Sequence, residues 1–376
     1  MKNRMLRYAL GLVALATTFS SCKTDFDLTG PYSERALVYA LLDPLNNPSE
    51  GGDGHLFRIQ KAFLGEASAF DMALVPDSSY FDPTDVIVQV LDILDGDTLN
   101  TWQLDTVSIG NKETGDPTDG TVDFFGPEQR LYKLNEDVLV GHTYMLLIEN
   151  MVTGYTAFSA IDMMDATTFK WTKPNQSSNA TYRGMNFKGN VGDYLGPSVN
   201  FLTAKNASRY ELWITFFYRE VAGNDTTQKT LTWRVKSGNF ARTDQAGETS
   251  GTFNIPGEQV FSFIGSNLEP KPGVTRILGK EYNNISGSGN KVGPDAFELI
   301  MFIAGTEFSN MLEITQGNQS AVLTDNPTFS NITNGLGVFS TRTTFTFSKL
   351  VPNDPTDIQE FISGQYTGDL DFTIDD

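Results

Sequence analysis

Residues 85–104 have the sequence DVIVQVLDILDGDTLNTWQL and contain the clearest structural signal in the chain. Residues 85–94 are rich in Val and Ile, and residues 98–104 are again β-prone. Between them stands Asp95-Gly96, a dipeptide that favours the tight turn of a β-hairpin because both residues tolerate positive φ angles. The stretch therefore predicts two antiparallel strands joined by a short turn.

Short strand-like runs on both sides of this hairpin extend the pattern. They are separated by Gly, Pro, Asn and Asp residues, which are typical of turns, and no convincing helix lies between them. The runs lie at residues 36–42, 56–64, 130–134, 143–150 and 155–161. Seven short strands at this spacing predict an antiparallel β-sandwich of the immunoglobulin or fibronectin type, which we place at residues 36–168.

The second half of the chain mixes strands with a few helices. Apolar side chains at residues 258–268 recur at helical spacing before Pro270 and Pro272, and a second helix is expected from Thr306. Strands are predicted at residues 210–221, 230–235, 296–304 and 343–347, the first two joined by a turn at Asn224-Asp225. We therefore expect residues 169–376 to form an α+β domain with an antiparallel sheet and a few short helices, in a chain that is mainly β.

The N-terminus has the layout of a bacterial lipoprotein signal. Lys2, Arg4 and Arg7 precede an apolar run at residues 8–16, which is too short to span a bilayer, and small residues then lead to Cys22. This resembles a lipobox, whose cysteine thiol receives a diacylglycerol. We predict a signal peptide at residues 1–21, lipidation of Cys22 and a tether at residues 22–35.

Cys22 is the only cysteine of the 376 residues, so no intramolecular disulfide is expected in the mature protein. The residues that follow, CKTDFD at 22–27, look like the signal that exports Bacteroidota lipoproteins to the outer face of the outer membrane. A plain acidic tether on a periplasm-facing protein is the alternative. We expect a protein that is lipid-anchored in the outer membrane and exposed at the cell surface.

Composition excludes several classes of protein. The chain is 39% hydrophobic and 12% aromatic, so it can bury a substantial core and disorder is not expected. Its formal net charge is −19, and beyond residue 7 it has no Lys/Arg cluster. Nucleic-acid binding needs a basic face, so we expect no nucleic-acid partner.

Three motifs lie at the limits of the predicted first domain and near the C-terminus. In the first motif, Cys22 and an acidic tether precede a strand that contains Leu37-Val38-Tyr39. In the second, GHTY at residues 141–144 leads through a hairpin to YTA at residues 155–157. The third is NITNGLGVF at residues 331–339. The combination resembles a group of uncharacterised Bacteroidota outer-membrane lipoproteins with an Ig-like N-terminal domain and a domain of unknown function. The resemblance implies location and architecture but no activity. We expect Gly335 and Gly337 to form a turn that Phe339 anchors in the core.

Candidate sites for chemistry are few. Carboxylates crowd two turns and could ligate calcium, but neither turn has the spacing of a calcium-binding loop, and solvated turn residues are the simpler interpretation. Neither histidine has a nucleophile motif nearby, so we expect no catalytic residue, metal or cofactor. Aromatic side chains could stack on a glycan, with the loop residues Tyr182 and Tyr194 favoured over the strand residues, which we expect to be buried. The residues concerned are Asp92, Asp95, Asp97, Asp116, Asp119, His55, His142, Trp102, Trp171, Trp213, Trp233, Tyr182, Tyr194 and Tyr218.

The sequence thus favours a non-enzymatic binding or accessory module of the cell envelope, with an outer-membrane transporter or a glycan as a possible partner. The alternative is a fimbrial or adhesive subunit, in which proteolysis removes an N-terminal strand and opens a groove for a donor strand. Cleavage after Arg35 would leave the first strand in place, whereas Arg58 and Lys61 lie beyond it but inside the next predicted strand.

Overall fold

The computed structural model of this protein describes residues 34–62, 75–110, 128–174, 183–189, 191–240, 249–280, 294–317, 329–352 and 354–374. The predicted signal peptide, Cys22 and the predicted tether up to residue 33 lie outside the described residues, as do Asp116, Asp119 and Tyr182. The predictions made for those residues stay predictions. Within the described ranges the chain is mainly β, as expected.

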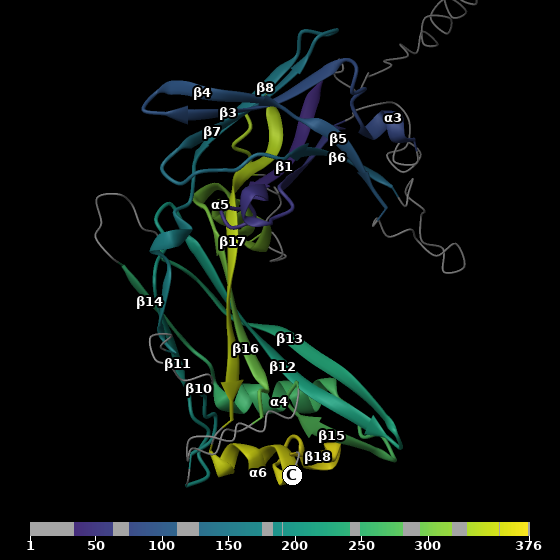
Figure 1. The fold of residues 1–376 in the computed structure, drawn as a ribbon, viewed down its shortest axis with the longest axis vertical. Helices are drawn as coiled ribbons and strands as arrows, with labels where there is room; N and C mark the ends of the chain where they lie inside the picture. Colours follow the sequence, from purple (N-terminus) through teal and green to yellow (C-terminus); the bar gives the residue numbers. More distant parts are fainter. Residues whose placement is uncertain are drawn as a thin grey trace, which may run out of the picture.

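The N-terminal domain is a β-sandwich, shown at the top of Figure 1. Its strands are β1 (Arg35–Leu42), β2 (His55–Ala62), β3 (Val86–Leu94), β4 (Asp97–Gln103), β5 (Asp105–Ile109), β6 (Gln129–Leu134), β7 (Thr143–Asn150) and β8 (Thr156–Asp162), with the short helices η2 (Pro48–Glu50) and α3 (Pro76–Ser79). One sheet has the order β1-β2-β6-β5 and the other β4-β3-β7-β8. These are the A-B-E-D and C′-C-F-G orders of an immunoglobulin-type sandwich. Of the eight sandwich strands in the described ranges, seven were predicted and β5 was not.

The predicted hairpin joins β3 to β4. Leu94 pairs with Asp97, and both turn residues have positive φ, at 52° for Asp95 and 91° for Gly96. This is the φ pattern of a type I′ turn, whose twist matches that of the strands it joins. Alternate residues of β3, such as Val86, Val88 and Val90, face the sandwich core.

Tyr144 explains the GHTY motif. Its ring is fully buried at the start of β7, and its hydroxyl accepts a hydrogen bond of 2.7 Å from the Leu139 N–H. Burial raises the pKa of Tyr144 to about 12. A tyrosine that bonds back to the chain just upstream is the tyrosine corner of immunoglobulin-type sandwiches. The motif therefore specifies the fold of this corner.

The first core is completed by a strand from the far end of the chain. β17 (Gly335–Val351) pairs in parallel with β1 through its first half and with the second domain through its remainder. In Figure 1 it runs from the sandwich down into the lower domain. Ile332 and Phe339 are buried in the sandwich core, where Phe339 packs on Phe57 with ring centroids 6.2 Å apart. The domain limits stay a prediction. The structure adds that the first half of β17, from the C-terminal part of the chain, belongs to the sandwich as well.

The motif at residues 331–339 is built for this docking. The Asn331 side chain accepts a hydrogen bond from the Phe339 N–H (3.0 Å) and donates one to the Phe339 carbonyl (2.7 Å). Gly335 and Gly337 lie in β17 beside β1, so they do not form the expected turn, although Phe339 is an anchor in the core. Gly337 has φ of 103°, and a Cβ there would lie 2.0 Å from the Val38 carbonyl oxygen. Glycine is needed here because two backbones approach too closely for a side chain.

Tyr155 ties the same strands together from the side. Its hydroxyl accepts from the Ala36 N–H and donates to the Asn334 carbonyl, both at 2.7 Å. The Asn334 amide donates to the Thr156 carbonyl at 2.8 Å and its oxygen accepts from the Arg35 guanidinium. The YTA motif therefore fixes the first residues of β1 to the first residues of β17.

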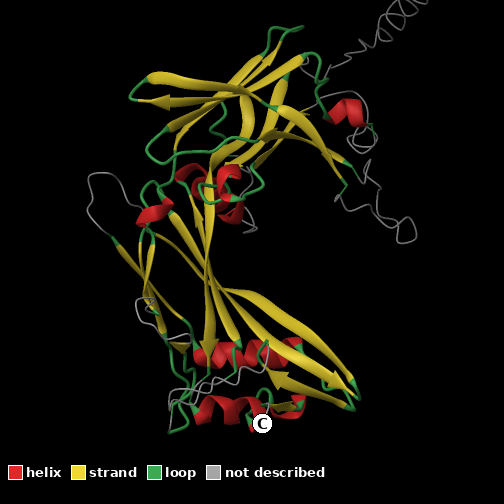
Figure 2. Ribbon diagram, viewed as in Figure 1, coloured by secondary structure: helices red, strands yellow, loops and turns green. Residues whose placement is uncertain are grey.

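The C-terminal domain is α+β, as predicted. Its elements are η3 (Ala166–Thr168), β9 (Lys170–Lys173), β10 (Arg183–Gly184), β11 (Ser198–Leu202), β12 (Arg209–Ala222), β13 (Asp225–Asn239), β14 (Ser250–Asn254), α4 (Gly257–Asn267), β15 (Val274–Leu278), β16 (Phe297–Ala304), α5 (Thr306–Gly317), α6 (Pro355–Ser363), η4 (Gly368–Leu370) and β18 (Phe372–Thr373), with β17. The strand order β18-β15-β12-β16-β17 continues into β1 of the sandwich, and β13 pairs with β12. Helices α4 and α6 lie together at the lower end of these strands in Figure 2.

One face of this sheet forms the second core. Tyr210, Leu212, Ile214 and Phe216 alternate along β12 and are buried, and the helices and the small sheet β14-β11-β9 contribute the remaining side chains. The other face carries Trp213 and Phe302, whose rings meet edge to face at 5.7 Å. Phe302 remains 40% exposed, so this second face is only partly covered.

A buried carboxyl group, that of Asp357, lies in the first turn of α6. Its Oδ1 accepts hydrogen bonds from the Phe187 N–H (2.9 Å) and the Lys188 N–H (2.7 Å), while its Oδ2 has no hydrogen-bond partner. Burial outweighs the two hydrogen bonds and raises the pKa of Asp357 to about 7. The folded chain therefore holds this carboxyl protonated in mildly acidic solution.

We expect Asp357 to make the folded protein less stable as the pH rises. In the unfolded chain the group is ionised above about pH 4, so between pH 4 and 7 the folded state binds one more proton. Below pH 4 the protonated Asp357 contributes fully to the free energy of unfolding. As the pH rises from 4 through 7, the free energy of unfolding falls by roughly 4 kcal/mol. Asp357→Asn retains an acceptor oxygen and cannot ionise. Urea unfolding should show that the free energy of unfolding falls less between pH 5 and pH 8 for this variant than for the wild type. Equal falls in the two proteins would contradict a raised pKa for Asp357.

Candidate binding groove and polar clusters

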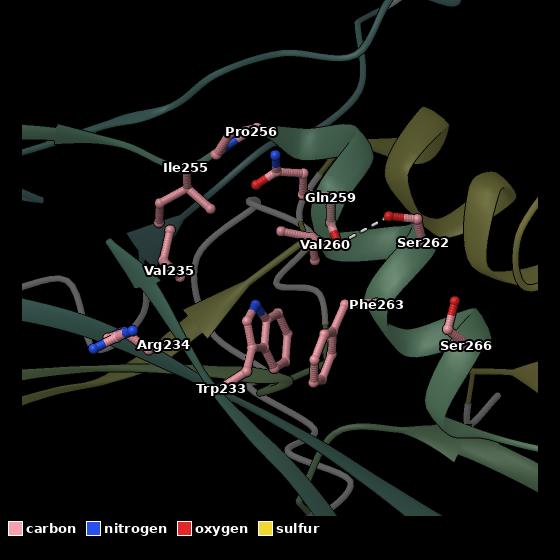
Figure 3. Close-up of a pocket in the computed structure, with 10 residues that line it drawn as sticks. All are labelled: Trp233, Arg234, Val235, Ile255, Pro256, Gln259, Val260, Ser262, Phe263 and Ser266. Atoms are coloured by element: carbon pink, nitrogen blue, oxygen red, sulfur yellow. Dashed lines mark hydrogen bonds between the residues drawn. The ribbon is translucent and has the colours of Figure 1, made fainter. Parts of the chain in front are cut away.

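The clearest candidate site is a groove between β13 and α4, shown in Figure 3. It encloses about 350 Å³, within the range of small-ligand pockets. Trp233 from β13 and Phe263 from α4 stack with ring centroids 4.5 Å apart and an interplanar angle of 21°. Figure 3 shows these two rings side by side, with Val235 and Ile255 forming the apolar wall beyond them.

The groove is positioned by two rigid elements. β13 pairs with β12 along its length, and every second side chain near its end, including Trp233 and Val235, points toward α4. Helix α4 is fixed on its other side by Val260, Phe261 and Ile264, which are buried in the core. Residues at a spacing of three or four lie on one helix face, so Gln259, Phe263 and Ser266 share the groove side.

Polar groups at the groove remain available for a ligand. The Gln259 side chain makes no hydrogen bond to any described residue, and Ser262 donates only to the Gln259 carbonyl, at 3.3 Å. Arg234 lies 3.5 Å from Glu211 and keeps 46% of its side chain exposed. The site therefore combines an apolar aromatic wall with an amide and hydroxyls that can donate and accept hydrogen bonds.

The predicted aromatic candidates fall into different environments. Burial was expected for the strand tryptophans Trp213 and Trp233, but both are half-buried, as is Trp102. Trp171 and Tyr218 are buried, and of these five residues only Trp233 lines the groove. Tyr194 is half-buried too, and its hydroxyl donates to Glu360 at 2.7 Å. The loop residue Tyr194, favoured for glycan stacking, does not line this groove, whereas the strand residue Trp233 does. The strand pattern could not reveal that β13 is an edge strand with a helix beside it.

The partly buried His142 and the buried Asp92 form a pair that the sequence did not connect. The His142 Nδ1 lies 2.6 Å from the Asp92 Oδ1, and the Asn100 amide donates to the other carboxylate oxygen at 3.1 Å. Asp92 is 2% exposed, so the solvated-turn interpretation does not hold for this residue. Asp95 and Asp97 are exposed turn residues, as that interpretation expects. Asp92 ties the β3–β4 hairpin to the start of β7, and no nucleophile motif lies beside it.

His55, unlike His142, is fully buried. It is 2% exposed, and its Nδ1 accepts a hydrogen bond of 3.3 Å from the Asp43 N–H. Burial lowers the pKa of His55 to about 4, so the ring is neutral in ordinary solution. Among the described residues, no group of three or more His, Cys, Asp or Glu side chains could hold a metal ion.

The cleavage sites of the fimbrial alternative lie in regular structure. Arg35 is the first residue of β1, and its guanidinium is held by Asn334. Arg58 and Lys61 lie within β2. β1 itself is paired on both sides, with β17 and with β2, so cleavage beyond it would cut into a second strand of the sheet.

Comparisons of the chain with known protein families and with curated proteins find no match. None of the described helices is long and apolar enough to cross a membrane.

Proposed function

We propose that this chain is a lipid-anchored protein of the outer membrane that acts as a non-enzymatic binding module. The lipobox-like N-terminus and the acidic residues after Cys22 support the location. The observation that carries the binding role is the groove in which Trp233 and Phe263 form an aromatic wall between a strand and a helix. Both elements are held by the second core, so the groove needs no rearrangement to accept a ligand.

A neutral glycan is the ligand that this groove fits best. Sugar rings present an apolar face to aromatic side chains and hydroxyls to amide and hydroxyl groups, and the groove offers both kinds of contact. An outer-membrane transporter that receives the glycan would be the corresponding partner. In this proposal the sandwich domain links the groove to the anchor.

Binding at the groove is tested with neutral oligosaccharides. Full-length protein is titrated with maltohexaose, cellohexaose and xylohexaose, and binding is measured by calorimetry. At least one of them should bind, and Trp233→Ala should weaken it by about tenfold or more, since a stacked aromatic group contributes on the order of 1 kcal/mol beyond its buried area. Trp213→Ala, on the opposite face of the sheet, is the matched control and should bind normally. Absence of binding, or equal losses in the two variants, would reject the glycan role of the groove.

The membrane anchor is tested separately at Cys22. Cys22→Ala should abolish labelling by a radiolabelled fatty acid and release the protein from the membrane fraction, because no other thiol can receive the lipid. Persistent labelling would rule out lipidation at this residue. Protease treatment of intact cells then distinguishes surface exposure from a periplasmic orientation.

A further inference from the structure

A second hollow lies on the sandwich domain, on the outer face of the sheet formed by β1, β2 and β6. It encloses about 520 Å³. Successive side chains of a strand point to opposite faces, so Tyr39, Leu41 and Leu56 point outward while their neighbours fill the core. Tyr39 is 45% exposed and Leu56 43% exposed. Together with Leu131 they give the hollow an apolar floor that is open to solvent.

Two arginines from distant parts of the chain meet at this hollow. Arg58 comes from β2, and Arg342 comes from β17, which lies beside β1 only because the C-terminal strand docks on the sandwich. Within the described residues, Arg58 uses only its Nε, which donates to the Gln60 side chain at 2.9 Å. The Arg342 side chain makes no hydrogen bond or ion pair to any described residue. Two guanidinium groups therefore keep most of their donors free, in a protein of strongly negative net charge.

Carboxylates line the same hollow without neutralising these arginines. Asp43 and Asp53 stand on the loop that follows β1, and neither forms an ion pair with Arg58 or Arg342 among the described contacts. One oxygen of Asp43 accepts a hydrogen bond from the Leu45 N–H at 3.0 Å, which fixes the carboxylate at the start of the loop. The hollow thus presents cationic donors from the strands and anionic acceptors from the loop above a common apolar floor.

We propose that this hollow is a second binding site, for a saccharide that carries a carboxylate group. The planar guanidinium groups of Arg58 and Arg342 match the two oxygens of a carboxylate. Ring hydroxyls can donate to Asp43 and Asp53, and the apolar face of the sugar can lie on Tyr39. A neutral sugar would leave the arginines unpaired, and a simple inorganic anion would not use the carboxylates or the apolar floor. The proposal requires neither the lipid anchor nor the groove beside α4.

The test uses glucuronic acid and glucose as matched probes, which differ in the carboxylate, together with inorganic sulfate. Binding to the full-length protein is followed by ligand-observed NMR titration. Glucuronic acid should bind at least tenfold more tightly than glucose and than sulfate. Arg342→Gln should weaken glucuronic acid binding at least tenfold, since charge-assisted hydrogen bonds to a carboxylate are among the stronger contacts in proteins.

Arg234→Gln is the control for this experiment, since Arg234 is an exposed arginine at the other site. It should leave glucuronic acid binding unchanged, and thermal unfolding should show that both variants fold. Equal binding of glucose would overturn the proposal, and so would sulfate binding as tightly as glucuronic acid. Equal losses in Arg342→Gln and Arg234→Gln would also overturn it. Loss of neutral glycan binding at the groove would leave this result unaffected, so the two proposals fail independently.

Discussion

Gly337→Ala is expected to separate the C-terminal strand from the sandwich and to remove much of the stability of the first domain. A Cβ at this position would lie 2.0 Å from the Val38 carbonyl oxygen, so either β17 or β1 must move. The φ of 103° adds strain, because L-residues with a side chain rarely adopt it. We expect a loss of roughly 4 kcal/mol in the free energy of unfolding, a large share of the 5–15 kcal/mol typical of a domain.

The loss should be local to the docked strands. β17 supplies backbone partners to β1 from Ala36 to Leu42 and places Phe339 in the core beside Phe57. Amide hydrogen exchange should therefore accelerate first in β1 and in the first half of β17. The β12–β16 pairing in the second domain should keep its protection, because β17 pairs with β16 only from Arg342 onward and not through the residues that pair with β1.

Gly223→Ala is the matched control for backbone conformation. Gly223 also has a positive φ, 62°, but a Cβ there would meet nothing within 4 Å. Its replacement should lower the free energy of unfolding by only about 1 kcal/mol, because alanine adopts a left-handed conformation less readily than glycine. Urea unfolding of the two variants distinguishes the effect of the close backbone approach at Gly337 from the effect of a positive φ angle alone. If both variants lose the same free energy of unfolding, the tight docking of β17 on β1 is not what stabilises the sandwich.

Local sequence signals were enough to predict the sandwich. The Asp95-Gly96 turn and the alternating Val residues of β3 act within a few positions, so their meaning does not depend on the rest of the chain. The α4 helix was predicted almost to its bounds for the same reason, since its apolar spacing and the prolines after it are local.

The pairing of β17 with β1 had no such signal. A parallel pair joins residues about 300 positions apart in this chain, and the glycines that permit it look like turn residues when only the sequence is read. The Asp92–His142 pair was missed because Asp92 lies in β3 and His142 stands just before β7, 50 positions later in the chain. The groove was missed because a tryptophan in a strand is expected to be buried, and only the tertiary arrangement leaves Trp233 beside α4.

Phe361 contacts side chains from several elements of the second core. It lies in α6, is fully buried, and stacks on Phe216 of β12 with centroids 5.3 Å apart and an interplanar angle of 5°. Its ring also meets Phe261 of α4 at 5.0 Å and Phe372 of β18 at 5.7 Å, both edge to face. One side chain near the end of the chain therefore joins two helices and two strands.

Phe361→Ala is expected to cost about 3–5 kcal/mol, because it removes a buried ring and leaves a cavity that four rigid elements cannot close. Phe302→Ala removes the same atoms from a side chain that is 40% exposed on the other face of the sheet, and should cost about 1 kcal/mol or less. Chemical unfolding of the two variants compares the same substitution at a fully buried and at a partly exposed position.

Because α6 also holds Asp357, which accepts hydrogen bonds from the Phe187 and Lys188 N–H groups, the Phe361 variant should lose protection against hydrogen exchange around residue 187 as well. Comparable destabilisation by the two substitutions would show that α6 rests on the sheet without organising the core.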